Sequence, residues 1–568
     1  MDLRHLAFSL LLAISCGCCR DAAMVSTDAP LTTEYLPATR ILWTAGAPEG
    51  SGKLLKAFCG QVAVNEPEVC TLHSGDAVLL DFGRELHGGL RITGAIRDSK
   101  ATPRVRIRFG ESVSEAMSDV ATTTATNEHS LRDFEASLPW LGSFETGNTG
   151  FRFVRIDILD DGGSPLPIVA VEAKSILRDL PYLGSFRCSD ERLNAIWQTA
   201  AYTVHLNMQD YVWDGIKRDR LVWIGDMHPE VMTINTVFGS QDVVRKSLDF
   251  ARDGTGPDEW MNGICSYSMW WCIIQRDLYL YTGNLAYLQE QHGYLAKLLR
   301  KIASCIDGNR ENFKEGRFID WPTSENPGSI HQCLQAMLIM TMKAGSDIAK
   351  ALEDPSLFKD CSACLKELAS YDYTEPATKQ AAAFMTLAGI LPEAEGAETI
   401  AEGGPDGFAT FTGYYMLEAL AAAGRYDDAM RIISDYWGGM LDLGATSFWE
   451  DLKYADLAKA GRIDEFVPEA VYDIHKDGGA YCYEGLRHSF CHGWASGPAP
   501  WMSRHVLGIE PLEPGFRKVR IEPHLGHLDW AEGTIPTPKG NIFISIRKHD
   551  DGKLRIVAKL PRGVKRDK

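Results

Sequence analysis

The N-terminal part of the chain contains short runs in which hydrophobic and polar residues alternate. A period of two places one face of a β-strand in a core and the other face in water. Gly, Asp, Ser and Pro separate the runs, as they do in turns between strands. From about residue 29 to residue 174 the pattern therefore predicts a β-sandwich. The clearest strand patterns are Val78–Phe82, Gly89–Thr93, Val105–Phe109 and Phe151–Ile156.

The pattern changes near Ser189, and helical stretches dominate from there to about Val506. Apolar residues three and four positions apart form one face of a helix. The loops between these stretches are long and contain Trp, Pro, Asp and Glu, which favours a closed helical barrel over a stacked repeat. Helices are predicted at Gln332–Leu352, at Gln380–Leu391 and at Tyr414–Tyr436 with a break at Gly424.

Strand patterns return after Gly508, so the predicted order is β, a long helical region, then β. This order predicts a multidomain protein in which the helical region is flanked by two β regions. The predicted C-terminal strands are Lys518–Ile521, Asn541–Ile546 and Leu554–Ala558.

The first residues carry an export pattern. Arg4 precedes the apolar run Leu6–Ile14, which is too short to span a bilayer and is typical of a signal peptide. Cys16 follows Ala-Ile-Ser in an arrangement that resembles a bacterial lipoprotein cleavage box. We predict a signal peptide with a lipobox over residues 1–20, and a periplasmic or outer-membrane lipoprotein. A secretory signal that is cut a few residues later, without lipidation, is the alternative.

Composition narrows the range of partners. The 568 residues include 58 Lys and Arg against 76 Asp and Glu, a formal net charge of −18. Such a charge disfavours nucleic acid or an anionic membrane surface as the main partner, and leaves a lipid anchor as the predicted membrane contact. The cysteines after residue 20 are odd in number and scattered, so no disulfide framework is predicted. Cys361 and Cys364 form an isolated CxxC, and we predict neither a metal site nor a cofactor.

The densest group of polar and aromatic residues is the segment Tyr211–Asp226. It contains three carboxylates, two arginines and two tryptophans, together with Gly215 and Gly225. Neighbouring carboxylates repel one another, which can keep one protonated near neutral pH. A protonated carboxyl can donate to a glycosidic oxygen, and an indole face can pack on a sugar ring. The alternative is a salt-bridged surface loop with buried Trp anchors.

Three further breaks between helices place polar groups beside aromatic residues. Each alone is more typical of packing than of chemistry, and His492 alone is more typical of a core histidine. Four such breaks on one helical domain nevertheless favour their convergence at one site. The three segments are Phe318–Glu325, Gly444–Asp451 and Ser489–Gly497.

These segments together resemble the bacterial α-L-rhamnosidases, glycoside hydrolase family 78, which are glycosidases of the six-hairpin type. Asp214–Asp226 is similar to the family signature of Asp, then Arg, acid, Arg, then Trp-x-Gly-Asp. Gly444–Glu450 looks like its Trp-Glu motif, and Ser489–Gly497 resembles its Ser-x-x-His segment. Resemblance extends to the family's β domains through Leu80–Gly83, Arg108–Ser112, Glu513–His524 and Trp530–Thr534.

The resemblance implies an (α/α)6 catalytic barrel flanked by an N-terminal β-sandwich and a small C-terminal β domain. The implied domains are residues 29–180, 185–507 and 508–568. It also implies an inverting exo-hydrolase that releases terminal α-L-rhamnose from rhamnose-containing glycans. Asp219 falls on the position of the family's general acid and Glu450 on that of the residue that activates water. The implied sugar-binding residues are Asp214, Arg218, Trp223, Asp226 and His492, with Trp270 and Trp321 as further wall residues.

One position departs from the family pattern. The acid is normally Glu, whereas this chain has Asp219, whose side chain is one methylene shorter. The shorter side chain leaves two alternatives open. One is an (α/α)6 glycosidase of different sugar specificity, and the other is a catalytically inactive sugar-binding lipoprotein.

Overall fold

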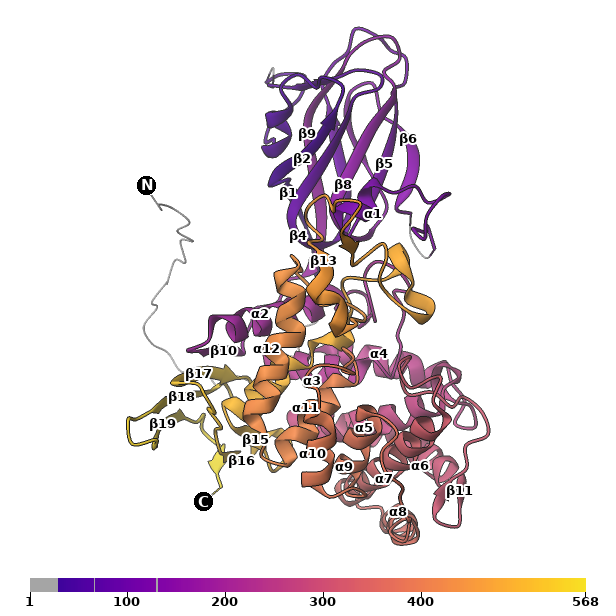
Figure 1. Ribbon diagram of the computed structural model, residues 1–568, viewed down its shortest axis with the longest axis vertical. Helices are drawn as coiled ribbons and strands as arrows, with labels where there is room; N and C mark the ends of the chain where they lie inside the picture. The colour runs from indigo at the N-terminus through magenta and orange to yellow at the C-terminus, as the bar shows by residue number, and fades with distance from the viewer. Residues whose placement is uncertain (1–28, 66, 129–130, 568) are drawn as a thin grey trace.

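The computed structural model describes residues 29–65, 67–128 and 131–567 (Figure 1). The predicted signal peptide and lipobox over residues 1–20 lie outside these described residues. The chain runs from a β region through a large set of helices to a second β region beside them. Within the described ranges, no helix combines the length and the apolar character that crossing a bilayer requires. The structure is thus a mixed α and β multidomain fold, as the hydrophobic pattern predicts.

The N-terminal strands form one connected nine-stranded sheet, in the order β1-β9-β4-β8-β5-β6 with β2, β3 and β7 paired at its sides. Its buried side chains form a hydrophobic core of their own, which includes residues of every predicted strand pattern. The strands are β1 (Leu31–Pro37), β2 (Arg40–Ala45), β3 (Cys70–Leu72), β4 (Ala77–Gly94), β5 (Arg104–Gly110), β6 (Asp133–Ser137), β7 (Gly142–Glu145), β8 (Thr149–Asp160) and β9 (Leu166–Arg178).

Strand β4 joins two of the predicted strands into one. The runs Val78–Phe82 and Gly89–Thr93 both lie within it, and its register with β8 shifts between Asp81 and Leu86. Strand β8 pairs with both halves of β4, whereas β2 pairs only with the first half and β9 only with the second. Gly88 has a φ of 146°, and a Cβ at this position would lie 1.8 Å from the carbonyl oxygen of Lys174. Only glycine fits at this close approach.

The helical region begins after β10 (Ser185–Cys188) and confirms the predicted helices to within a few residues. Gly424, with a φ of 72°, separates α11 from α12 at the predicted break. The helices are α2 (Glu191–Asn207), α3 (Met227–Val237), α4 (Asp242–Asp253), α5 (Cys265–Thr282), α6 (Leu285–Ala303), α7 (Pro327–Ala351), α8 (Pro355–Leu368), α9 (Lys379–Ala388), α10 (Glu393–Ala401), α11 (Gly413–Ala422), α12 (Tyr426–Asp442) and α13 (Pro498–Trp501).

Alternate helices pack against one another in sequence. Helix α3 contacts α5, α5 contacts α7, α7 contacts α9, and α9 contacts α11. The short helix α13 contacts both α11 and α3, so the series returns to its start. The helices between them, such as α8, pack on this inner series. The loops at one end of the inner helices therefore come close together in space.

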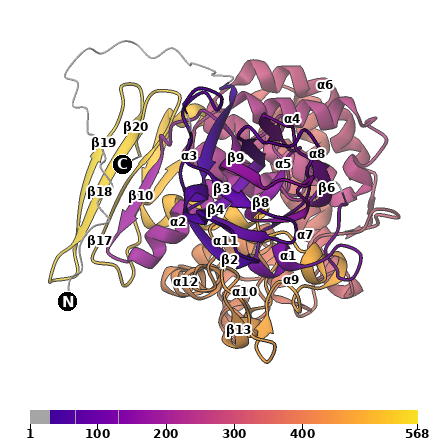
Figure 2. The same cartoon turned by 90° about the horizontal axis from the view of Figure 1, so that it is seen from above.

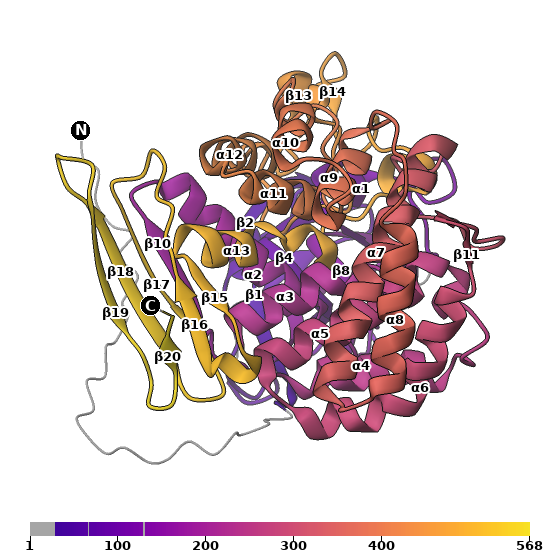
Figure 3. The same cartoon turned by 90° about the horizontal axis from the view of Figure 1, so that it is seen from below.

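The C-terminal strands form two small sheets on one side of the helices (Figure 3). Strand β10, which precedes the first long helix, pairs with β17 and so joins the C-terminal sheet (Figure 2). One hydrophobic core continues from the helices into these sheets. The strands are β15 (Ile509–Pro511), β16 (Lys518–Ile521), β17 (Trp530–Ile535), β18 (Ile542–Lys548), β19 (Leu554–Lys559) and β20 (Lys565–Arg566).

A buried ion pair connects the N-terminal sheet to the helical region. Arg152 on β8 donates to both carboxylate oxygens of Asp81 on β4, at 2.8 and 3.0 Å. The same guanidinium donates to the carbonyl oxygen of Gly444 at 2.9 Å, in the loop that follows α12. Asp81 and Arg152 are both buried. This ion pair therefore fixes the start of a loop that carries predicted site residues.

We expect Arg152→Met to lower the free energy of unfolding by about 2–3 kcal/mol, because buried Asp81 loses the bidentate partner and keeps only the half-exposed Arg40, which lies 2.8 Å away. Arg104 is the matched control, since its pair with Glu135 spans 3.3 Å and both side chains are more than half exposed. Arg104→Met is expected to cost less than about 1 kcal/mol. Denaturant unfolding measures both variants, and equal losses in the two would contradict the role of the buried pair.

Candidate functional site

The segment between α2 and α3 forms a closed loop. The N–H of Asp214 donates to the carbonyl oxygen of Leu221 at 3.1 Å, and Asp214 Oδ1 accepts from the N–H of Leu221 at 2.9 Å. Gly215 forms an isolated β-bridge with His492, and the N–H of Gly493 donates to the Asp214 carbonyl at 2.8 Å. Two of the predicted clusters are thus joined directly by their backbones.

Two residues at the tip of this loop have left-handed backbones. Asp219 has a φ of 56° and Arg220 a φ of 53°. Non-glycine residues seldom adopt this region, and each such residue costs on the order of 1 kcal/mol or more. The surrounding hydrogen bonds hold the turn, including one of 2.7 Å from the N–H of Arg220 to the carbonyl oxygen of Arg218. Strained residues of this kind concentrate at functional sites.

Arg218 brings two carboxylates to one buried guanidinium. Its Nη2 donates to Glu450 at 2.6 Å to Oε1 and 2.5 Å to Oε2. Its Nη1 lies 3.2 Å from Oδ1 of Asp219. Burial opposes the charge of Arg218, but Glu450 and Asp219 more than offset this and raise its pKa. The guanidinium therefore stays charged and holds these two carboxylates close to each other.

The backbone on both sides of Glu450 is fixed as well. The N–H of Glu450 donates to the carbonyl oxygen of Ser489 at 3.0 Å, and its own carbonyl oxygen accepts from Thr410 and from the indole of Trp494. The N–H of Ser489 lies 3.3 Å from Oε2 of Glu450. The predicted segments Gly444–Asp451 and Ser489–Gly497 therefore meet at this carboxylate.

His492 lies among three of the carboxylates. Its Nε2 is 3.5 Å from Glu450 Oε1 and 3.8 Å from an oxygen of both Asp214 and Asp226. Burial lowers the pKa of His492 well below its usual value, and Arg218 lowers it further. A neutral imidazole is therefore present at neutral pH, and it offers one hydrogen-bond donor and one acceptor.

Burial raises the pKa of three acids around this histidine. The pKa of Asp214 and that of Asp226 lie well above the ordinary value, mainly because of burial and also because neighbouring carboxylates repel. Burial also raises the pKa of Glu450, although Arg218 counteracts it. Carboxyls with raised pKa values in one place are typical of sites that transfer protons.

A cavity of about 260 Å³ opens onto these groups. Aromatic residues form much of its wall, and Trp223 meets Tyr267 edge to face at 6.1 Å. Trp321 packs edge to face on Phe318 and Tyr483 and parallel to Tyr481. The lining residues are Asp214, Arg218, Asp219, Trp223, Asp226, Ile264, Tyr267, Phe318, Trp321, Glu450, Cys482, Tyr483, His492 and Trp494.

The structure brings eight of the nine predicted site residues to this cavity, whereas Trp270 lies elsewhere. Trp270 is fully buried, and its ring stacks on Tyr415 at 4.7 Å and on His228 at 5.1 Å. The prediction that Trp270 forms part of the sugar-binding wall is therefore corrected, and its place is in the helical core. Nearly every side chain of α5 is buried, so hydrophobic spacing could not show which face meets the cavity.

Sequence reasoning missed several residues at the site. Tyr267 lines the cavity from α5, three residues before Trp270, and its hydroxyl lies 3.4 Å from Asp226. Tyr483 carries the guanidinium of Arg218 over its ring at 5.3 Å. The sequence signal that could have identified Tyr483 is the spacing of the aromatic residues in the segment around it. Phe318 and Trp494 lie within predicted segments but were not singled out.

Glu230 on α3 is a buried acid behind the cavity. It is completely buried, and neither carboxyl oxygen has a hydrogen-bond partner among the described residues. Burial raises its pKa well above the ordinary value, and Asp226 and Asp214 raise it further. The folded protein therefore binds a proton here more tightly than the unfolded chain does.

This proton gives a stability prediction with a definite sign. Since the folded pKa of Glu230 is raised, its contribution to stability is lost as pH rises above the unfolded value near 4.3, by up to about 1.4 kcal/mol per pH unit. We expect Glu230→Gln to reduce the fall in unfolding free energy between pH 5.5 and pH 8, measured by denaturant unfolding. Glu290→Gln, at an exposed acid, should leave the fall unchanged. A fall as steep in Glu230→Gln as in the parent would contradict this account.

Comparison with known proteins places the chain in a family. The model for the bacterial α-L-rhamnosidase six-hairpin glycosidase domain matches residues 181–506, and the model for the bacterial α-L-rhamnosidase C-terminal domain matches residues 508–567. The α-L-rhamnosidase of Alteromonas sp. (strain LOR) is 25% identical over 535 residues, which cover 84% of this chain and 54% of that protein. The chain spans about half the length of the curated relatives it matches.

Solved structures share the fold. A GH78 family rhamnosidase of Bacillus sp. GL1 aligns with a TM-score of 0.73 and 21% identity, over 91% of this chain and 56% of that chain. A rhamnosidase from Klebsiella oxytoca, solved with rhamnose bound, aligns with a TM-score of 0.66 and 20% identity, over 84% of this chain and 96% of that chain. Since the six-hairpin domain model covers more than half of the chain, the protein belongs to the family of bacterial α-L-rhamnosidases with a six-hairpin glycosidase domain.

Proposed function

We propose that the protein hydrolyses terminal α-L-rhamnosides in rhamnose-containing glycans. The observation that carries the proposal is the contact of one buried guanidinium, that of Arg218, with both Asp219 and Glu450 at the wall of the cavity. Glycoside hydrolysis uses a pair of carboxylic groups with different roles. Family membership and a solved relative with rhamnose bound support the choice of sugar.

In the proposed reaction, Asp219 is the general acid and Glu450 the general base. Asp219 donates its proton to the glycosidic oxygen as the bond from the sugar carbon to that oxygen breaks. Glu450 takes a proton from water as the water oxygen bonds to the sugar carbon from the opposite face. This inverting route requires a carboxyl separation of about 6.5–9.5 Å, which admits the water. Arg218 supports this role by lowering the pKa of Glu450 against the effect of burial, since a base acts only in its deprotonated form.

The size and lining of the cavity support action on a chain end. Its volume of about 260 Å³ is smaller than the common range for drug-sized ligands, about 300–1,000 Å³, and suits a single sugar residue. Trp223 and Trp321 offer flat faces for the apolar side of a sugar ring, while Asp214, Asp226 and His492 offer polar atoms for its hydroxyls. We therefore assign these five residues to substrate binding.

We also propose a barrel for the helical region, a sandwich for the N-terminal β region and a lipid-anchored location. The closed series of contacts through α3, α5, α7, α9, α11 and α13 supports an (α/α)6 barrel. The expected β-sandwich draws support from the nine-stranded sheet, in which β2 and β9 pair with different halves of β4. The lipid-anchored location in the periplasm or outer membrane depends on the sequence of residues 1–20 alone.

We expect Asp219→Asn and Glu450→Gln each to lower kcat/KM for an aryl α-L-rhamnoside by about 10²–10⁴, the usual contribution of a general acid or base. The loss of kcat/KM in Asp219→Asn should be smallest on substrates with good leaving groups, because these groups need little protonation. The loss of kcat/KM in Glu450→Gln should be the same on all substrates. Glu325→Gln is the matched control, since Glu325 is exposed near Trp321. An inactive parent, or full rates in both variants, would contradict the proposal.

A panel of other aryl glycosides tests the two alternatives. Turnover of a different sugar in preference to rhamnoside would indicate a related glycosidase, in which Asp219 meets a differently placed ring. Rhamnose binding by calorimetry without turnover, with affinity retained in Glu450→Gln, would indicate a binding protein.

The stereochemistry gives a separate prediction. We expect proton NMR of the first-formed sugar to show inversion at the anomeric carbon, because water rather than a carboxylate is the proposed nucleophile. The spectrum is recorded before mutarotation equilibrates the two anomers. A retained anomer would contradict the role of Glu450 as a base and would make it a nucleophile.

A further inference from the structure

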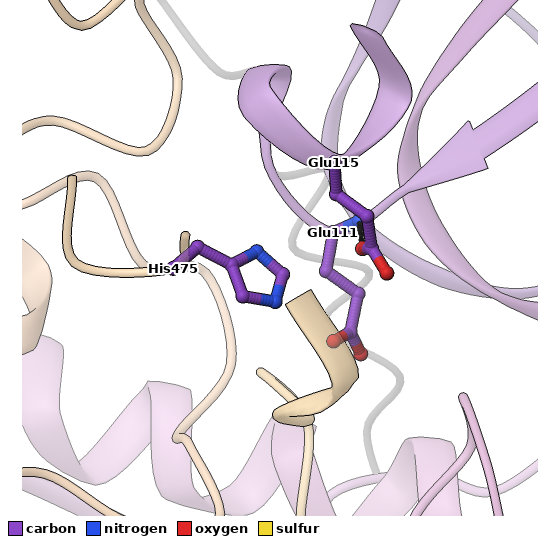
Figure 4. Close-up of side chains that lie close together, drawn as sticks. All are labelled: Glu111, Glu115 and His475. Atoms are coloured by element: carbon purple, nitrogen blue, oxygen red, sulfur yellow. Dashed lines mark hydrogen bonds between the residues drawn. The ribbon is translucent and has the colours of Figure 1, made fainter. Parts of the chain in front are cut away.

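A second buried polar cluster lies behind the cavity, where the N-terminal β region meets the helical region. Glu111 follows β5, and Glu115 lies in the short helix α1 (Val113–Met117). Figure 4 shows these two glutamates on one part of the chain and the ring of His475 facing them from another. Lys217, from the loop between α2 and α3, completes the cluster. All four side chains are buried.

The ammonium of Lys217 lies between the two glutamates of this cluster, and the buried guanidinium of Arg132 also contacts Glu115, at 3.0 Å. Lys217 Nζ lies 2.8 Å from Glu115 Oε1 and 3.4 Å from Glu111 Oε2. One ligand atom each from Glu111, Glu115 and His475 lie within 4.8 Å of one another, a spacing that a metal ion could also fill. His475 Nε2, however, lies 3.4 Å from the same Nζ. The geometry therefore favours the ammonium in this place.

The cluster holds the backbone of residues 486–490. Lys217 Nζ donates to the carbonyl oxygens of Leu486 and His488 at 2.8 and 2.5 Å. Glu111 Oε2 accepts from the N–H of Phe490 at 2.6 Å. A charged partner makes each of these hydrogen bonds stronger than a neutral one. One side of this segment is thus held by Lys217 and Glu111, of which Glu111 comes from the N-terminal β region.

The other side of the same segment faces Glu450. The carbonyl oxygen and the N–H of Ser489 contact the backbone and the carboxylate of Glu450. The carbonyl oxygen of Arg487 accepts from Arg218 Nε at 3.1 Å. Lys217 and Arg218 are consecutive, so adjacent side chains reach the two sides of one segment. A movement of residues 486–490 would shift Glu450 and Arg218 together.

We infer that Lys217, Glu111 and Glu115 are positioning residues, which hold residues 486–490 so that Glu450 and Arg218 keep their catalytic geometry. The inference rests on the proposed function for its kinetic consequence. It assigns to the N-terminal β region a part in building the active site, although that region does not line the cavity.

The test uses the full chain with Lys217→Met, which keeps the length of the side chain, and Glu111→Gln, which keeps an acceptor and is the milder change. Glu418→Gln is the control, because Glu418 on α11 is a carboxylate only 12% exposed that pairs with Arg504 and His505 away from the cavity. Hydrogen exchange of the amides in residues 486–490 is measured by mass spectrometry. Kinetics on an aryl α-L-rhamnoside give kcat, KM and their pH dependence.

We expect exchange in residues 486–490 to rise by about tenfold or more in Lys217→Met, as when a hydrogen bond to a charged group is lost. We also expect kcat to fall more than KM changes. The acid limb of the pH profile should move to higher pH, because Arg218 then lowers the pKa of Glu450 less. Glu111→Gln should show the same effects on exchange, kcat and the acid limb more weakly. Glu418→Gln should show none of these effects.

Exchange in residues 486–490 that matches the control would overturn the inference, as would faster exchange with kcat and the acid limb unchanged. A metal ion bound by the parent in equimolar amount and lost from Glu111→Gln would overturn the assignment of Lys217 as the cation. If the parent does not hydrolyse rhamnosides, the proposed function fails, whereas the exchange measurement still decides whether the cluster holds the segment.

Discussion

The guanidinium of Arg218 is the contact on which the candidate site depends. Buried carboxylates are costly unless a cation compensates them, and here one guanidinium contacts both Glu450 and Asp219. Its planar array of donors suits this task better than an ammonium, since Nη1 and Nη2 point to different partners. The other acids at the cavity, Asp214 and Asp226, have no such cation and instead have raised pKa values. The site thus combines two acids that lack a nearby cation in the described part of the chain with a pair of acids that share the guanidinium of Arg218.

Holding Asp219 beside Arg218 has a conformational cost. The left-handed backbones of Asp219 and Arg220 turn the chain sharply, and the closure of the loop between Asp214 and Leu221 keeps that turn in place. The pairing of Gly215 with His492 then ties the loop to the segment that faces Glu450. Local strain is therefore offset by hydrogen bonds among three segments that are far apart in the sequence.

Much of the fold was predictable, because alternation and helical spacing reflect one buried face. The break at Gly424 and the strands within β5, β8 and β18 follow from such patterns. Convergence of the four polar segments was also predictable, since each interrupts a helical domain. The position of Trp270 was not predictable, because α5 is buried on nearly all sides. The left-handed backbone of Asp219 was not predictable either, because glycine is the usual sequence signal for that conformation and this position is not a glycine.

The contacts of Lys217 show why the rest of the site has no local sequence signal. Lys217 and Glu115 are about a hundred residues apart and belong to different regions of the fold, yet their charges lie 2.8 Å apart. Burying either charge without partners would be costly, and Lys217 also contacts Glu111 while Glu115 also contacts Arg132. Their burial therefore requires the N-terminal sheet and the helical region to be docked together. Docking in turn fixes residues 486–490 against Glu450. The site is complete only when both regions are folded, although the cavity belongs to the helical region alone.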